Sequence, residues 1–220
     1  MGKLIVIEGV DGSGKGTQTA RLVRSLRDAG RSVEVFSFPR YAAGHYGELV
    51  GKYLNGDLGD HNDPHLVALL YAGDRQTARE ELLRAARTHD FVVCDRYVSS
   101  NIAHQCPRVA PEREAGLRQW IEYVEYIVND LPSPALQIML DVPVEVAAQR
   151  ILLKASRGYT DKAKDLHEAD TAYLSRVIAA YRQLASGNSR WVTVTDDGVG
   201  GNTTQLVADK VFQAVKARVW

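Results

Sequence analysis

The chain has 220 residues, 45% of them hydrophobic, which is enough for one α/β core, so we expect a single domain over residues 1–220. Its 27 basic and 27 acidic residues leave no net charge, so we expect neither nucleic acid nor an anionic membrane surface as a partner. No apolar run is long enough to span a bilayer, and two isolated cysteines, Cys94 and Cys106, favour a reducing, cytoplasmic setting.

Short, nearly continuous apolar runs alternate with longer segments of helical periodicity, a pattern typical of buried parallel strands joined by helices. The predicted elements are strands at 4–7, 33–38, 91–94, 136–140 and 191–194, and helices at 15–29, 45–54, 64–86, 111–130, 143–154, 168–186 and 203–217. This order predicts a three-layer α/β fold in which helices flank a five-stranded parallel sheet. Such sheets bind ligands beyond the carboxyl ends of their strands.

A glycine-rich segment at residues 9–17 (GVDGSGKGT) follows the first predicted strand and opens the first predicted helix, which is the context of a phosphate-binding P-loop. Its glycines let successive backbone N–H groups converge on phosphate oxygens, and Lys15 adds a positive charge. The motif therefore predicts a P-loop NTPase fold. The residues expected to bind ATP here are Gly12, Ser13, Gly14, Lys15, Gly16 and Thr17.

Two positions are candidates for holding magnesium. The residue after the P-loop lysine is usually Ser or Thr, but here it is Gly16, and the hydroxyl follows one residue later as Thr17. Asp95 ends the third apolar run, where a carboxylate can hold Mg²⁺ directly or through water. We therefore expect Thr17 and Asp95 to be the metal ligands. Arg96 follows immediately and is a candidate catalytic residue, as Lys15 is.

Four segments decide among the kinases, GTPases and ATPases that share a P-loop: residues 8–11 (EGVD), 38–41 (FPRY), 69–75 (LLYAGDR) and 95–105 (DRYVSSNIAHQ). In this order and spacing they resemble the thymidylate kinase family over nearly the whole chain. The resemblance implies ATP-dependent phosphorylation of dTMP to dTDP in dTTP biosynthesis, with Mg²⁺ as cofactor, by a homodimer. The alternative is a broader (deoxy)nucleoside-monophosphate kinase that accepts dUMP or purine monophosphates.

The same resemblance implies roles on the acceptor side. Arg96 contacts the acceptor phosphate and the transferring group, Arg40 clamps that phosphate, and Asp11 accepts from the deoxyribose 3′-hydroxyl. His104 stands where many family members carry a tyrosine that crowds the 2′ position, so it bears on sugar selection. The full set expected to bind dTMP is Asp11, Phe38, Arg40, Tyr41, Tyr71, Arg75, Arg96, Ser100, Asn101, His104 and Gln105.

The base is expected to meet two residues one helical turn apart, Tyr71 and Arg75. By resemblance, Tyr71 stacks on thymine, Arg75 donates to a pyrimidine carbonyl, and Phe38 packs beneath the base. Asn101 and Gln105 fall on the matching positions at the edge of the base.

Several alternatives stay open. Arg75 can instead form a surface ion pair with Glu80 or Asp74, and His104 can be a packing residue. A GTPase-like switch would need an NKxD-type guanine element, which the sequence lacks. A nucleotide-binding scaffold without turnover would be expected to lose the arginines, which are present.

A basic, polar segment at 155–167 (ASRGYTDKAKDLH) interrupts the alternation and is expected to form a lid that excludes water from the phosphates. A solvated charged surface is the alternative. In the family the catalytic arginine lies in the P-loop or in the lid, and this P-loop has none, so Arg157 is expected to supply it. Arg150 is expected to stack on adenine, which the glycine-rich loop at 196–202 could border. The catalytic set is then Lys15, Asp95, Arg96 and Arg157.

Overall fold

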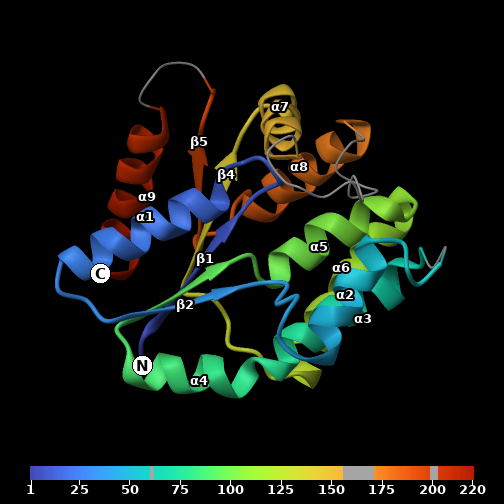
Figure 1. Ribbon diagram of the computed structural model, residues 1–220, viewed down its shortest axis with the longest axis horizontal. Helices are drawn as coiled ribbons and strands as arrows, with labels where there is room; N and C mark the ends of the chain where they lie inside the picture. The colour runs from blue at the N-terminus through green and yellow to red at the C-terminus, as the bar shows by residue number, and fades with distance from the viewer. Residues whose placement is uncertain (60–61, 156–170, 199–202) are drawn as a thin grey trace.

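Five parallel strands form the centre of the computed structural model (Figure 1), which describes residues 1–59, 62–155, 171–198 and 203–220. The strands are β1 Lys3–Glu8, β2 Val33–Ser37, β3 Phe91–Asp95, β4 Leu136–Asp141 and β5 Trp191–Thr195, in the spatial order β2-β3-β1-β4-β5. A parallel sheet of this order, flanked by helices, confirms the predicted fold class. The single-domain organisation stays a prediction.

Helices occupy most of the rest of the described chain. They are α1 Lys15–Asp28, α2 Gly44–Leu54, α3 Pro64–Thr77, α4 Arg79–Thr88, α5 Val98–Gln105, a 3₁₀ turn (η1) Cys106–Arg108, α6 Pro111–Glu122, a π-helical segment (η2) Tyr123–Val128, α7 Val144–Ala155, α8 Thr171–Ala185 and α9 Thr203–Val219. Within the described ranges, no helix is both long and apolar enough to cross a membrane.

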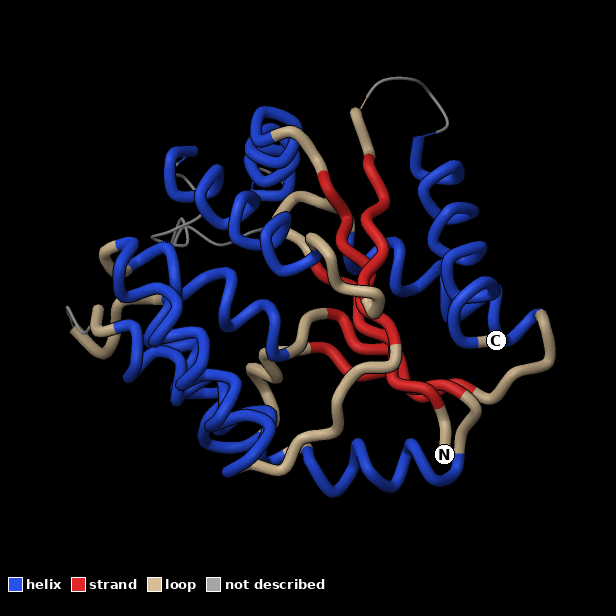
Figure 2. The backbone as a smooth tube through the Cα atoms, turned by 180° about the vertical axis from the view of Figure 1, so that it is seen from behind, coloured by secondary structure: helices blue, strands red, loops and turns tan. Residues whose placement is uncertain are grey.

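The sheet lies between two helical layers (Figures 1 and 2). Alternate side chains of β1 point to opposite faces of the sheet, as expected for a strand buried on both sides. Leu4 and Val6 pack into a core with residues of α4, α5, α6 and α8. Ile5 and Ile7 pack into the opposite core with residues of α1 and α9. Each face of the sheet therefore carries its own apolar cluster, and the carboxyl ends of the strands stay available for the site.

Two helices differ from the predicted pattern. The helix predicted at 64–86 is two helices, because the chain turns at Ala78, after the Thr77 hydroxyl donates to the Asp74 carbonyl oxygen at 2.8 Å. The apolar spacing continues across this turn, so periodicity alone does not reveal it. Helix α5 has no prediction at all, because its sequence, VSSNIAHQ, lacks an amphipathic pattern. Seven of its eight residues are nevertheless buried.

The loops after β1, β2 and β3 emerge at the same edge of the sheet. The first two carry the P-loop and the cis peptide bond between Phe38 and Pro39, and the third begins with Arg96, directly after Asp95 at the end of β3. Helix α3 packs against α2 and α5 beyond this edge, so the region past the strands is enclosed by helices. Arg157, residues 156–167 of the expected lid and residues 199–202 of the glycine-rich loop lie outside the described residues.

Candidate active site

The P-loop has a backbone path that only glycine follows without strain. Gly12 and Gly14 have φ angles of 77° and 89°, in the left-handed region, and Gly14 caps the N-terminus of α1. A Cβ atom on Gly12 would lie 2.3 Å from the carbonyl oxygen of Ala147, so a side chain there would collide with α7. The loop therefore curls tightly against the start of α1, as a phosphate cradle requires.

Lys15 is buried at the first position of α1, beneath this loop. Its Nζ donates to the Val10 carbonyl oxygen at 2.8 Å and lies 3.6 Å from the Asp11 carboxylate. Burial, together with the nearby charge of Arg96, lowers the pKa of Lys15 to about 8. An anion such as a phosphate would favour the charged form and counter this effect.

Asp95 lies beside the first turn of α1. A Cβ atom built on Gly16 would come 3.5 Å from Asp95 Oδ2, so the carboxylate faces the position where P-loops usually carry a hydroxyl. Thr17, one residue on, is exposed. The described residues hold no group of three or more His, Cys, Asp or Glu side chains that could bind a metal. One carboxylate and one hydroxyl fit Mg²⁺, which takes most of its ligands from phosphates and water.

Arg96 has a strained backbone, and its side chain forms several polar contacts. Its φ is 66°, which is uncommon for a residue with a Cβ atom, and its backbone N–H donates to the Ile7 carbonyl oxygen at 3.0 Å. Its guanidinium forms an ion pair with Asp11 and donates to the Gly9 carbonyl oxygen at 3.3 Å. Burial by itself lowers the pKa of Arg96, but Asp11 and the other acidic groups around it, Tyr181, Glu8 and Asp95, together raise it. The guanidinium is therefore a permanent positive charge fixed beside the P-loop.

Glu8, at the end of β1, holds the Arg96 loop in place. Its carboxylate is fully buried and accepts from the backbone N–H groups of Tyr97 at 3.0 Å and Ser100 at 3.2 Å. It also accepts from the Ser100 hydroxyl at 2.7 Å and the Tyr181 hydroxyl at 3.0 Å. Burial raises the pKa of Glu8, and the hydrogen bond from Ser100 opposes this rise. No role is predicted for Glu8 from the sequence, although it ends a buried strand as Asp95 does.

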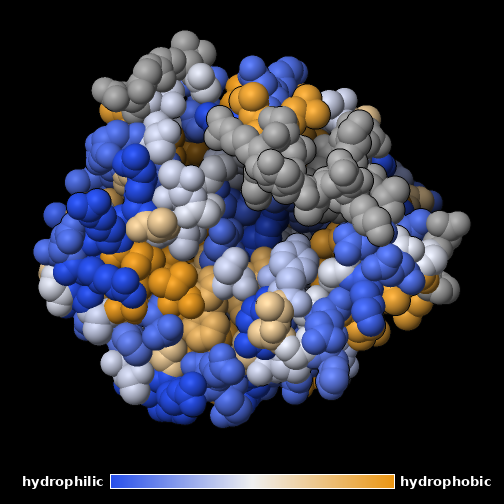
Figure 3. Space-filling model, viewed as in Figure 1, coloured by the Kyte–Doolittle hydropathy of each residue, from blue (hydrophilic) through white to orange (hydrophobic). Residues whose placement is uncertain are grey.

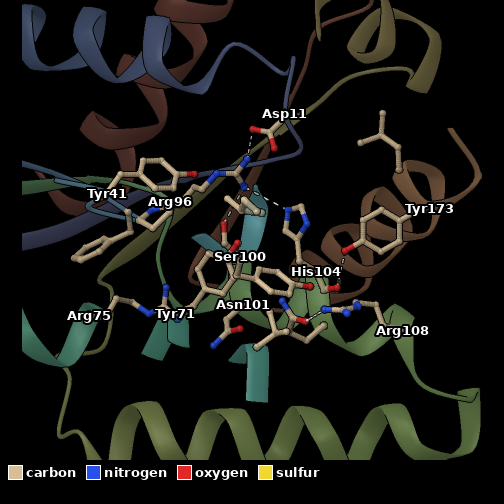
Figure 4. A pocket seen from close by; sticks show the side chains of 17 residues that line it. Asp11, Tyr41, Tyr71, Arg75, Arg96, Ser100, Asn101, His104, Arg108 and Tyr173 are labelled. Carbon is tan, nitrogen blue, oxygen red and sulfur yellow. Dashed lines mark hydrogen bonds and ion pairs between the residues drawn. The ribbon is translucent and has the colours of Figure 1, made fainter. Parts of the chain in front are cut away.

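A cavity of about 200 Å³ lies beyond the P-loop, between α2, α3, α5 and α8 (Figure 4). Every residue expected to bind dTMP lines it, except Arg40. Further lining residues that the sequence analysis did not single out include Tyr53, Arg108 and Tyr173. Polar side chains lie at the floor of the hollow near the centre of the space-filling view in Figure 3. Aromatic rings and charged groups therefore share one enclosed space.

Arg40 is not among the residues that line this cavity, and its role as a phosphate clamp stays a prediction. Its Nε lies 3.3 Å from Asp74 Oδ1, its backbone N–H donates to the same carboxylate at 2.8 Å, and its Nη2 donates to Thr77 Oγ1 at 2.7 Å. Asp74 is buried and needs a partner for its charge, which explains why the guanidinium turns toward α3. Arg40 Nη1 also lies 3.5 Å from Glu81 Oε2.

Arg75 does line the cavity, but its ion-pair partner is neither Glu80 nor Asp74. Both groups of the pair are buried: Arg75 Nε donates to Glu125 Oε2 at 2.9 Å, and Nη2 pairs with Oε1. The partner lies 50 residues away in sequence, on η2. Helical spacing cannot reveal such a contact.

His104 lies against Arg96 and two tyrosine rings. Its Nε2 is 3.4 Å from Arg96 Nη1, and its ring centroid lies 6.3 Å from those of Tyr173 and Tyr181. Its carbonyl oxygen accepts from the Tyr173 hydroxyl at 2.7 Å. The histidine is thus both part of the cavity wall and a neighbour of the candidate catalytic arginine (Figure 4).

Arg150 connects the P-loop to the loop after β5. Its Nη1 lies 2.9 Å from Asp196 and 3.5 Å from the Gly12 carbonyl oxygen. Arg150 is therefore beside the P-loop and is not among the residues that line the cavity. Stacking of Arg150 on adenine stays a prediction.

A phosphate-binding loop that faces a second, enclosed cavity is the arrangement of kinases that phosphorylate nucleoside monophosphates, with the donor on the loop and the acceptor in the cavity. This chain is an enzyme of that class. It belongs to the thymidylate kinase family, whose family profile, described as Thymidylate kinase, matches residues 7–199.

Known proteins similar to this chain agree with the family. It is 35% identical over 208 residues to thymidylate kinase from Mycobacterium tuberculosis (strain ATCC 25618 / H37Rv), covering 93% of this chain and 97% of the relative. It is 31% identical over 206 residues to thymidylate kinase from Caenorhabditis elegans, covering 90% and 84%. The solved structure of thymidylate kinase from Candida albicans superposes with a TM-score of 0.76 at 21% identity, covering 98% of this chain and 92% of that one, and supports the fold.

Proposed function

We propose that this protein transfers the γ-phosphoryl group of ATP to dTMP, giving ADP and dTDP. The observation that carries the proposal is one cavity whose two ends differ in their chemistry. Asp11 and Arg96 line it beside the P-loop, where the acceptor phosphate would lie, and Tyr71, Arg75 and Asn101 line it where a base would lie. A nucleoside monophosphate has this combination of an anionic end and an aromatic, hydrogen-bonding end.

The proposed mechanism is direct transfer with little covalent chemistry by the protein. Lys15 and the backbone N–H groups of the P-loop would bind the donor phosphates, and Arg96 would stabilise the charge that develops on the transferring group. Thr17 and Asp95 would hold Mg²⁺, which would neutralise charge between the phosphates. The acceptor phosphate is already anionic, so no general base is required. Arg157 of the lid segment is proposed as a second cation.

The proposal is tested by ADP release from Mg-ATP with a panel of acceptors: dTMP, dUMP, ribothymidine monophosphate, dGMP, AMP and thymidine. We expect kcat/KM to be highest for dTMP and thymidine to be inactive, because Arg96 needs an acceptor phosphate. Comparable rates with purine monophosphates would support the broader kinase, and comparable rates with the ribonucleotide would show that His104 does not select the sugar. If no acceptor leads to ADP release, the proposal is contradicted.

We also propose a homodimer that forms through α3 and η2. Leu66 and Leu69 on α3, and Tyr123 and Ile127 on the adjacent η2, are exposed apolar side chains on neighbouring elements. Apolar side chains clustered in this way are typical of interfaces between subunits.

Substituting both Leu66 and Leu69 with aspartate is expected to convert the dimer to a monomer, because each charge would be buried at the interface without a partner. Light scattering should change from about twice the chain mass of 24.3 kDa to that mass itself. Leu206→Asp, on the exposed side of α9, is the matched control and should leave the dimer intact. A monomeric wild-type protein would contradict the dimer.

A further inference from the structure

Glu125 is a buried carboxylate in a segment that has exposed side chains on either side of it. Helix α6 passes directly into the π-helical η2, and the exposed fractions of Tyr123 and Ile127 are 57% and 67%, whereas Glu125 is 0% exposed. A π-helical turn is rare and is often found at functional sites. Burial of a carboxylate is costly unless the carboxylate is paired, so the role of Glu125 follows from the groups that it contacts.

The carboxylate binds two cavity residues at once. Glu125 Oε1 lies 3.1 Å from Arg75 Nε and 2.8 Å from Asn101 Nδ2, and Oε2 lies 2.9 Å from Arg75 Nε. Arg75 Nη2 pairs with the same group. The hydrogen-bond directions of Arg75 and Asn101 are therefore set by one side chain.

The amide of Asn101 has only one possible orientation. Its nitrogen faces Glu125 Oε1 and, at 3.0 Å, the Ala68 carbonyl oxygen. Both partners are acceptors, so the NH₂ group must face them and the amide oxygen must face away. Asn101 Oδ1 is buried, belongs to a residue that lines the cavity, and has no hydrogen-bond partner among the described residues. It is an acceptor without a donor.

Arg75 supplies the complementary group. Its Nε and Nη2 are directed to Glu125, so Nη1 is the nitrogen that remains for a molecule in the cavity. Burial favours loss of its charge, but the charge of Glu125 and its hydrogen bonds, with smaller effects of Tyr97 and Asp74, together raise the pKa of Arg75. The cavity thus offers an N–H donor and a carbonyl acceptor, and both are fixed by the same carboxylate.

We propose that Glu125 is a positioning residue that sets base selectivity, by directing an Arg75 donor and the Asn101 acceptor at the base. This rests on the proposed function, since it concerns the base of the same acceptor. The pair complements a ring edge with a carbonyl oxygen beside an N–H group, which thymine and uracil share. Cytosine presents an amino donor beside a bare ring nitrogen, so both of its hydrogen bonds would be mismatched.

The test is Glu125→Gln, which keeps the shape of the side chain but removes its charge and one acceptor. We measure the Kd of dTMP, dUMP and dCMP by calorimetry, without ATP, and kcat/KM for the same three nucleotides. The preference for dTMP over dCMP is expected to fall on the order of 30-fold, because the Asn101 amide can then reverse and Arg75 loses its anchor. The ratio of dTMP to dUMP should stay within about twofold, since both share the same edge.

Glu122→Gln is the matched control, because the same chemical change falls three residues, about one helical turn, earlier on a partly exposed side chain paired with Arg118. It should leave all three Kd values unchanged. A proportional loss for dTMP, dUMP and dCMP in Glu125→Gln would indicate a purely structural role and would overturn the proposal. So would an unchanged preference for dTMP over dCMP.

If Glu125→Gln does not fold, Glu125→Asp decides the question. It keeps the charge but shortens the reach, so a smaller fall in the preference is expected, and no change would overturn the proposal. The two proposals fail in different ways. Absence of turnover with all nucleotides would contradict the kinase function, whereas the Kd ratios test Glu125 whether or not phosphoryl transfer occurs.

Discussion

Replacing Arg96 by alanine is expected to lower kcat by about 10³-fold, the magnitude typical of an arginine that stabilises a phosphoryl-transfer transition state. The guanidinium is held by Asp11 and by the Gly9 carbonyl oxygen, so its charge is preorganised before substrates bind. Steady-state kinetics at saturating ATP and dTMP give the rate.

The fold should survive this change. Position 96 keeps a non-glycine residue at positive φ, so the backbone cost is unchanged, and Asp11 is exposed enough to be solvated once its partner is removed. Circular dichroism checks this point. Arg96→Lys is the control that keeps the charge but loses the planar, forked donor set, and it should give an intermediate rate. A kcat for Arg96→Ala within about tenfold of wild type would remove Arg96 from the catalytic set.

Glu8→Ala is expected to reduce the free energy of unfolding by about 3 kcal/mol or more, the largest stability effect anticipated for a single change. The substitution leaves the backbone N–H groups of Tyr97 and Ser100 and the Tyr181 hydroxyl without their acceptor in a buried setting, and it opens a cavity. For a chain of this size the expected fall in Tm is roughly 10 °C.

Urea denaturation followed by circular dichroism measures this effect. Glu34→Ala, an exposed glutamate on β2, is the matched control and should change stability by no more than about 0.5 kcal/mol. Glu8→Gln keeps two acceptor positions on one oxygen, so its loss of stability should lie between those of Glu8→Ala and Glu34→Ala. A loss below about 1 kcal/mol for Glu8→Ala would show that the Arg96 loop is held by other contacts.

Much of the fold follows from local sequence patterns. The five strands are predicted because each is a short, continuous apolar run, and the P-loop because its glycines and lysine occupy fixed positions between a strand and a helix. The pair Asp95 and Arg96 is predicted for a similar reason, since a buried strand seldom ends in adjacent opposite charges without a function. Each of these signals lies within a few consecutive residues of the sequence.

The remaining features depend on contacts between distant parts of the chain. Helix α5 is buried by its neighbours, so its polar sequence gives no periodic signal. Arg40 turns toward Asp74 because that carboxylate is buried, and burial is not visible in a single sequence. Glu125 reaches Arg75 across 50 residues, from a π-helical segment that apolar periodicity does not distinguish from an α-helix. Sequence reasoning therefore identifies most of the cavity residues without identifying what orients them.

The central claim is that the phosphoryl group passes directly from ATP to dTMP. The most direct test follows γ-³²P-labelled ATP with the wild-type protein, Mg²⁺ and dTMP, and separates the products by chromatography. We predict that label leaves ATP only when dTMP is present and is recovered in dTDP, with one dTDP formed for each ADP. Label recovered as inorganic phosphate, at a rate independent of dTMP, would contradict the account.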